Sequence, residues 1–290
     1  MIVSAQTVNA PLQRDLLGYC AYITIPDAAA YDAAAQVLGA FRPAKAIPVD
    51  APHYTLTRDY GLWTVSRPGT RFATDGELTN GLLALEWQLV TDALAARSDL
   101  FHLHAAALAT PDNGAGVLIV GNSGSGKTTL VLALMQRGFL PYSDDVALLD
   151  PATLRLRPFP RAFHVREGTY ALLDDSPGAP VWNEATMPHG FFLPPQYAVA
   201  SAPVRLVLFP MLRPGQPPEL VPLGPGESAP LLLTQTLTLT ESPTLALGTA
   251  ARLTGAANCY RLFTGDLTAT ADRVAALAIG AAARTPTAAP

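Results

Sequence analysis

The sequence predicts an α/β fold, and three observations lead to it. An apolar run at residues 116–120 enters a glycine-rich loop that opens directly into a segment with the apolar spacing of a buried helix. The apolar runs at 101–110 and 204–212 are typical of strands buried on both faces of a sheet. After the loop, a helix ending at Arg137-Gly138 and a short strand-like run at 139–143 are expected to cross a parallel sheet.

Residues 1–77 are expected to form a small β-rich N-terminal region. An alanine-rich stretch at 28–40 predicts a short helix, and 43–52 reads as an extended loop. Pro and Gly separate three strand-like runs, YCAYITI at 19–25, HYTLTRDY at 53–60 and LWTVSR at 62–67.

Residues 78–284 are expected to form the larger domain, followed by a disordered tail at 285–290. No proline interrupts 78–98, where the apolar positions predict a long helix. Beyond Asp150 the proline-rich chain predicts loops over the nucleotide or acceptor site, including 174–202. The remaining elements expected here are strands at 204–212 and 259–265 and a closing helix at 269–283.

Composition excludes some partners. The formal net charge is −4, only 14% of residues are charged, and no run of Lys or Arg occurs, so neither nucleic acid nor a membrane is an expected partner. Cys20 and Cys259 lie far apart, without the spacing of a disulfide framework or a zinc site. No secretory signal is seen, and the apolar stretch at 274–283 is shorter than the ~20 residues of a membrane span. A cytoplasmic location is expected.

The glycine-rich loop has the pattern G-x-x-x-x-G-K-[ST] of a phosphate-binding loop (Walker A) between Gly121 and Thr128. Backbone N–H groups and the positive end of the next helix would hold a polyphosphate, Lys127 would reach its outer phosphates, and Thr128 would be a magnesium ligand. A surface Gly/Ser loop is the alternative, but the flanking strand and helix favour nucleotide binding. The expected nucleotide-binding residues are Gly121, Asn122, Ser123, Gly124, Ser125, Gly126, Lys127, Thr128 and Thr129.

The acidic pair Asp144-Asp145 follows Lys127 by 17 and 18 residues (144 − 127 and 145 − 127). One helix and one strand across a parallel sheet return the chain to the edge that carries the loop. Phosphoryl transfer needs magnesium at the phosphates and a group that orients the attacking hydroxyl. Adjacent aspartates can divide these tasks, whereas elsewhere such a pair is more often a helix cap or a turn.

His104 lies in the strand before the loop strand, so it can approach the same phosphates. His102, two residues earlier on the same strand face, is its competitor for this role.

These residues resemble HPr kinase/phosphorylase and the wider group of HPr-kinase-related proteins, whose core is similar to that of phosphoenolpyruvate carboxykinase. The resemblance runs through His104, GVLIVG at 116–121, SGSGKT at 123–128 and Asp144-Asp145. It implies a P-loop kinase domain that uses ATP and Mg²⁺. His104, Lys127, Asp144 and Asp145 would be catalytic, with Thr128 and Asp144 at the metal and one aspartate as general base.

Most of residues 80–284 resembles the subgroup that includes peptide-tailoring kinases, such as those modifying lasso peptides. For this reason 227–239 is expected to be helical, although LLLTQTLTLT at 231–240 has the period of a strand. The E-I-R-G signature of HPr kinases is missing after the acidic pair, where VREGT at 165–169 corresponds only loosely through Arg166 and Glu167. HPr itself is therefore not expected to be the acceptor.

The predicted function is an ATP- and Mg²⁺-dependent kinase acting on a serine or threonine hydroxyl of a peptide or protein, with peptide natural-product tailoring as the role that the resemblance implies. The alternatives are a small-molecule hydroxyl kinase and a non-catalytic nucleotide-binding partner protein. An ABC-type ATPase is disfavoured, because no LSGGQ-like segment follows the loop. The oligomeric state is left open.

Overall fold

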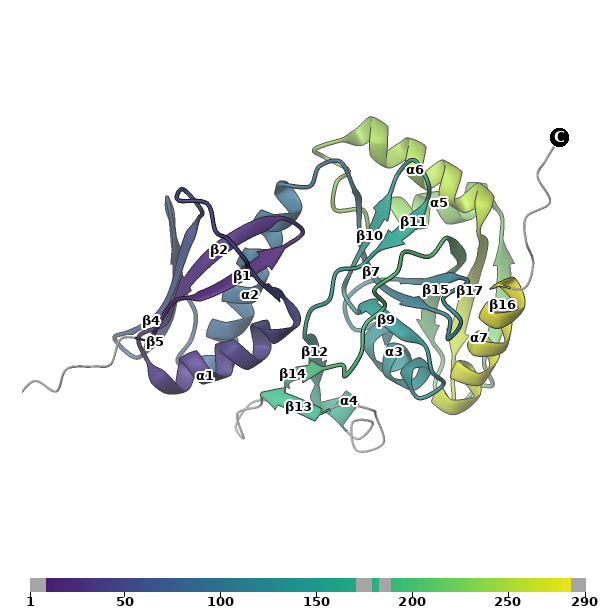
Figure 1. Ribbon diagram of the computed structural model, residues 1–290. Coiled ribbons are helices and arrows are strands. Elements are labelled where there is room, and N and C mark those ends of the chain that lie inside the picture. The colour runs from purple at the N-terminus through teal and green to yellow at the C-terminus, as the bar shows by residue number, and fades with distance from the viewer. Residues whose placement is uncertain (1–8, 171–178, 183–188, 283–290) are drawn as a thin grey trace, which may run out of the picture. The chain divides into compact units, whose positions relative to one another are not determined.

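The computed structural model describes residues 9–170, 179–182 and 189–282 of the 290-residue chain. The chain forms two compact units (Figure 1). The first comprises the chain up to Arg97 with His164–Arg166 and Pro180–Leu193, and the second comprises the rest. The tail expected at 285–290 lies outside the described residues.

The first unit contains a six-stranded sheet of order β3-β1-β2-β4-β5-β6, with helix α2 (Leu78–Ala95) packed on the sheet and helix α1 (Ala28–Val37) in contact with α2. Asp27 begins α1, because its side chain accepts a hydrogen bond from the N–H of Ala30 at 2.9 Å. The strands are β1 (Leu12–Leu16), β2 (Tyr19–Thr24), β3 (Arg42–Pro43), β4 (His53–Asp59), β5 (Leu62–Arg67) and β6 (Thr70–Ala73). The three predicted strands and the first helix are confirmed, whereas β1, β3 and β6 were not anticipated.

Helix α2 belongs to the first unit, which differs from the expected boundary at residues 77/78. Its buried side contacts β5, β4, β2 and β1, and the chain passes to the second unit only after Arg97. The apolar side of this helix was predicted, but a sequence pattern does not identify the sheet that the helix covers.

Part of the region expected to form loops is strand. Strands β12 (Phe163–Arg166), β14 (His189–Leu193) and β13 (Ala179–Trp182) form a three-stranded sheet in that order, and β12 leads into a short helix, α4 (Glu167–Tyr170). Residues 171–178 and 183–188 of the expected loops lie outside the described residues.

The second unit is built on an eight-stranded sheet of order β11-β10-β7-β8-β15-β17-β16, with β9 also paired to β7. In this sheet the neighbouring pairs β8–β15 and β15–β17 are parallel and the other neighbouring pairs are antiparallel, so the expected parallel sheet is in fact mixed. A short turn joins β7 to β8 and requires them to be antiparallel. The strands are β7 (Phe101–Ala109), β8 (Gly116–Val120), β9 (Leu140–Ser143), β10 (Val146–Asp150), β11 (Arg155–Arg157), β15 (Val204–Leu212), β16 (Glu219–Leu223) and β17 (Asn258–Thr264).

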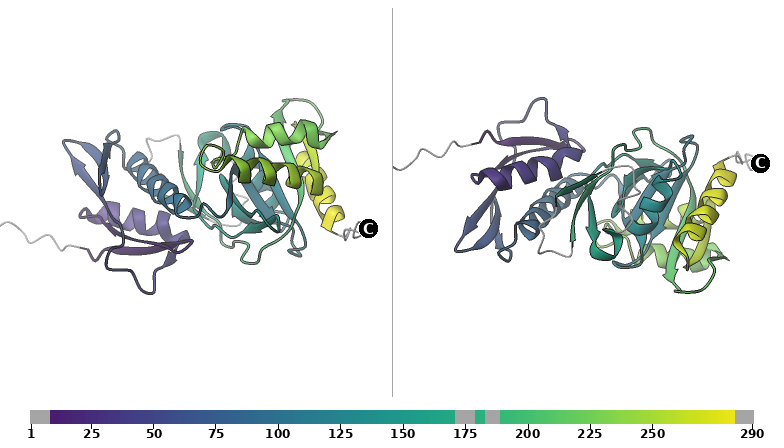
Figure 2. Two further views of the ribbon diagram at one scale, coloured as in Figure 1. Left: turned by 90° about the horizontal axis from the view of Figure 1, so that it is seen from above. Right: turned by 90° about the horizontal axis from the view of Figure 1, so that it is seen from below.

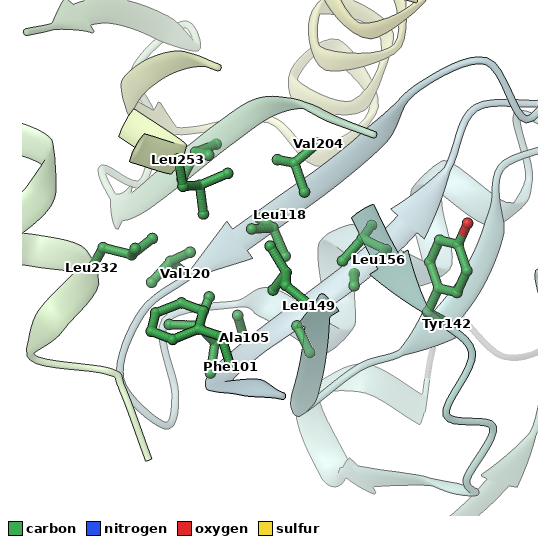
Figure 3. Close-up of a cluster of buried hydrophobic side chains, with 14 of the residues drawn as sticks. Phe101, Ala105, Leu118, Val120, Tyr142, Leu149, Leu156, Val204, Leu232 and Leu253 are labelled. Atoms are coloured by element: carbon green, nitrogen blue, oxygen red, sulfur yellow. The ribbon is translucent and has the colours of Figure 1, made fainter. Parts of the chain in front are cut away.

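Helices cover this sheet in two pairs, α3 with α7 and α5 with α6 (Figures 1 and 2). They are α3 (Lys127–Met135), α5 (Pro225–Leu233), α6 (Pro243–Ala256) and α7 (Leu267–Ala282). Phe101 and Ala105 of β7 are fully buried in one core with Leu232 of α5 and Leu253 of α6 (Figure 3). Since side chains alternate along a strand, the even-numbered residues of β7, which include His104, face the opposite side, where α3 contacts β7.

The segment expected to be helical at 227–239 is helical only from Pro225 to Leu233. Residues 234–240 form turns, and the period-two pattern yields a single bridge between Thr236 and Leu103. Threonine hydroxyls compete for the carbonyls of the last helical turn: Thr234 Oγ1 donates to the carbonyl of Leu231 at 2.7 Å. The backbone of this turn also forms hydrogen bonds with the backbone of β7. A continued helix would use the same backbone groups within itself.

No helix in the described ranges is long and apolar enough to cross a membrane.

Candidate functional site

Strand β7 brings the glycine-rich loop and the acidic pair together. On one side, β8 ends with Val120 opposite Ala105, and the loop begins at the next residue. On the other side, Ser143 of β9 lies opposite Ala107 and Val146 of β10 lies opposite His104. β9 and β10 therefore pair one after the other with the same edge of β7. Asp144-Asp145 lies between them, beside Ala105.

Glycines allow the loop to turn tightly into α3. Gly124 and Gly126 have φ angles of 82° and 87°, a region that other residues rarely adopt, and Gly126 is the residue that precedes α3. A Cβ on Gly121 would lie 2.8 Å from the Oγ of Ser125, so a side chain there would collide with the loop itself. The loop thus presents backbone rather than side chains at the start of the helix.

Lys127 is the first residue of α3 and is buried (5% exposed). Its Nζ donates to the carbonyl of Gly121 at 2.7 Å and to that of Asn122 at 3.2 Å, and it lies 3.3 Å from His104 Nε2. The ammonium group is held at the centre of the loop, where phosphate oxygens could replace the carbonyls as its partners.

Thr128 and Asp144 form a separate pair, in which the Thr128 hydroxyl donates to Asp144 Oδ2 at 3.0 Å. Asp144 is buried, and burial together with the charge of Asp145 raises its pKa well above the usual range, despite the opposing effects of Arg161 and Thr128. A buried carboxylate of raised pKa is a group that a cation would stabilise.

Hard oxygen ligands of this kind fit Mg²⁺. In the part of the chain that the structure describes, no group of three or more His, Cys, Asp or Glu residues could hold a metal ion. Magnesium commonly binds through one or two protein oxygens and completes its shell with substrate phosphates and water, so the Thr128–Asp144 pair meets that requirement.

Asp145 lies between His104 and Arg161. Its Oδ1 is 2.9 Å from His104 Nε2, and its Oδ2 is 3.9 Å from a guanidinium nitrogen of Arg161. Burial alone would raise the pKa of Asp145, but the hydrogen bond with His104 and the charges of Arg161, His104 and Lys127 outweigh it and lower the pKa below the usual range. The two neighbouring aspartates are thus in opposite electrostatic environments.

The two histidines of β7 are distinct in this site. The His104 side chain is 28% exposed and bonded to Asp145, whereas His102 is only 3% exposed. His104 is the histidine for which the structure gives contacts to Lys127 and Asp145.

Three residues near the loop were not singled out from the sequence. Arg161 comes from the proline-rich loop after β11. Gln235 Nε2 donates to Asn122 Oδ1 at 2.7 Å, and the Thr169 hydroxyl of α4 lies 3.3 Å from that of Thr129. Pro158 and Pro160, which both precede Arg161, are the only sequence signal we find for any of them.

The loose E-I-R-G correspondence falls at the junction of β12 and α4. Arg166 is exposed at the end of β12, and the side chain of Glu167 is outside the described part of the chain.

Comparison with known proteins gives no match to a protein-family model and no match to a curated protein.

Proposed function

We propose that this protein is an ATP- and Mg²⁺-dependent kinase that transfers the γ-phosphoryl group to a serine or threonine hydroxyl of a peptide or protein. The observation that carries the proposal is the pairing at the glycine-rich loop, where Thr128 bonds to Asp144 and Asp145 bonds to His104 beside Lys127. On this proposal the second unit is a P-loop kinase domain of the HPr kinase and phosphoenolpyruvate carboxykinase type, acting in the cytoplasm.

The loop and Lys127 would bind the nucleotide. Backbone N–H groups at the start of α3 and the positive end of the helix favour phosphate, and the Lys127 ammonium would move from the loop carbonyls to the outer phosphates. Thr128 and Asp144 would hold Mg²⁺, which when bound neutralises charge on the phosphate oxygens.

Asp145 would orient the attacking hydroxyl. Its lowered pKa keeps it ionised at neutral pH, so it can accept a hydrogen bond from the acceptor. The acceptor oxygen forms a bond to the γ-phosphorus as the bond to the ADP oxygen breaks, and the hydroxyl proton passes to Asp145. His104, between Asp145 and Lys127, would lie beside the transferred group and stabilise its charge.

The acceptor is proposed to be a peptide or protein other than HPr, because the signature associated with HPr is missing from this sequence. A peptide-tailoring role follows from the same resemblance.

Transfer of labelled phosphate from ATP tests the proposal with three acceptors: peptides encoded beside this gene, HPr and free serine. We expect labelling of a peptide that requires Mg²⁺ and is lost in Lys127→Ala. Labelling of free serine alone would favour a small-molecule kinase. Tight MgATP binding without any transfer would favour a non-catalytic nucleotide-binding protein, and full transfer by Lys127→Ala would refute the site.

A further inference from the structure

We propose that Arg161 is a positioning residue that fixes the carboxylate of Asp145 from the side opposite His104. The inference rests on the proposed kinase function and adds to it a residue outside the glycine-rich loop and the acidic pair.

The two oxygens of Asp145 have different partners. Oδ1 is bonded to His104 Nε2 at 2.9 Å, and Oδ2 faces the Arg161 guanidinium at 3.9 Å. Partners on both oxygens oppose rotation of the carboxylate about its terminal torsion, which is otherwise soft. The separation from Arg161 is longer than a hydrogen bond, so the attraction there is electrostatic.

The loop that carries Arg161 is firmly anchored. Phe159 and Ala162 are buried, and Pro158 and Pro160 each fix a backbone φ angle. The Tyr197 hydroxyl donates to the carbonyl of Arg161 at 2.6 Å. The backbone that carries the guanidinium is therefore anchored to the rest of the second unit.

The burial of Arg161 also has to be compensated. Its side chain is only 7% exposed, and a buried cation is costly unless opposite charge lies nearby. Asp144 and Asp145 supply that charge, and the guanidinium lowers the pKa of both. Arg161 and the acidic pair therefore form a buried group of opposite charges and not an ion pair on the surface.

Loss of Arg161 should therefore affect the chemical step more than nucleotide binding. With Oδ2 unrestrained, the hydroxyl would be oriented less often for attack, and small errors of alignment reduce rate strongly. We expect kcat to fall by about 10- to 100-fold while the KM for ATP changes by less than about threefold.

The experiment compares Arg161→Ala and Arg161→Lys with the control Arg157→Ala, which removes an exposed arginine of β11. Phosphoryl transfer by the wild-type chain is measured first, because its absence with every acceptor refutes the kinase function and this inference together. With an active wild type, we expect the kcat loss in Arg161→Ala, partial recovery in Arg161→Lys, and no change in Arg157→Ala.

Millimolar guanidinium provides the decisive readout, since it can enter the space vacated in Arg161→Ala. We expect it to restore part of kcat in that variant and to leave the wild type and Arg157→Ala unchanged. Unchanged kcat in Arg161→Ala, or a loss that guanidinium does not restore in a protein that melts like the wild type, overturns the inference while the kinase function stands. If Arg161→Ala does not fold, Arg161→Gln replaces it, and wild-type kcat in that variant overturns the inference.

Discussion

Adjacent aspartates in this chain have different partners, and on the proposed function each would have its own task. Asp144 is bonded to Thr128 of the loop helix, whereas Asp145 points to His104 and Arg161. The sequence alone left open which of them is the general base. The hydroxyl of Thr128 beside Asp144 favours the metal role for that residue and leaves the acceptor to Asp145.

Asparagine at the two positions should therefore have different kinetic effects. We expect Asp145→Asn to lower kcat by at least about 100-fold with little change in nucleotide affinity, because a neutral amide cannot take the hydroxyl proton. Asp144→Asn should instead raise the Mg²⁺ concentration needed for half-maximal transfer. Magnesium titrations of both variants test this, and equal metal dependence in the two would contradict the assignment.

The raised pKa of Asp144 predicts a stability gain when its charge is removed. The unfolded-state pKa is about 3.9. As pH rises above that value, the unfolded state ionises more readily than the folded state, so the wild type loses stability up to the folded pKa. In metal-free buffer we expect Asp144→Asn to be more stable than the wild type by about 1–3 kcal/mol at pH 7.5, with the gain shrinking toward pH 4.

Denaturant titration across this pH range measures the effect, and Asp145→Asn is the matched control. The folded pKa of Asp145 is lowered, so its stabilisation is present above about pH 4 and is lost on acidification through the folded pKa. Asp145→Asn should thus be less stable than the wild type at neutral pH. Equal effects of the two substitutions would show that the carboxylates share one environment.

The histidines of β7 should separate in the same way. We expect His104→Ala to reduce kcat, because His104 contacts both Lys127 and Asp145. His102→Ala should reduce the free energy of unfolding by about 1–3 kcal/mol and leave kcat near the wild-type value, because His102 is a buried polar residue whose removal disturbs the packing of β7. Thermal melting and initial rates on both proteins decide between these outcomes, and the reverse result would assign the functional imidazole to His102.

At the scale of elements, the sequence predicts helices and strands that depend on local spacing. It does not predict segments whose conformation depends on contacts with distant parts of the chain. The strand–loop–helix around Gly121 and the helix at Leu78–Ala95 follow from apolar spacing and glycine placement within a few residues. Residues 234–240 could not be predicted from their own period, because their conformation depends on β7. Gln235 O accepts from the N–H of His104 at 2.8 Å, and the N–H of Leu237 donates to the carbonyl of His102 at 3.0 Å.

The same reasoning explains what was missed at the candidate site. Arg161 approaches Asp145 from a loop 16 residues further along the chain (161 − 145), and no periodicity reports such a contact. The spacing from Lys127 to the acidic pair did predict their meeting, because one helix and one strand return the chain to the same sheet edge.

Residues 234–237 extend the sheet beyond the end of β8, and this role can be tested at Leu237. Leu237→Pro removes the N–H that donates to His102, so we expect about 1–3 kcal/mol of destabilisation and a lower kcat through displacement of the adjoining His104 backbone. Leu237→Ala is the control, because it keeps the N–H and removes only a side chain that is 39% exposed. Similar losses of stability and kcat in the two variants would assign the effect to the side chain instead.

For the whole molecule, the residues of the candidate site belong to the second unit. Lys127, Thr128, Asp144, Asp145 and Arg161 all lie between Ser98 and Phe163. The chain nevertheless returns to the first unit twice, at His164–Arg166 and at Pro180–Leu193, before it completes the second. Neither unit is therefore one continuous stretch of the chain, although the site residues all belong to the second unit.

Nucleotide binding should therefore stabilise the two units unequally. A ligand that binds only the folded state stabilises it by about 2.7 kcal/mol at a hundredfold excess over Kd. With Mg²⁺ and a non-hydrolysable ATP analogue, we expect slower amide hydrogen exchange at Gly121–Thr129 and at Asp144-Asp145, and unchanged exchange in the strands β1–β5 of the first unit. Lys127→Ala at the same nucleotide concentration is the control and should show little protection, because the charge at the outer phosphates is missing. Protection of β1–β5 in the wild type would contradict the prediction and show that the first unit also responds to the nucleotide.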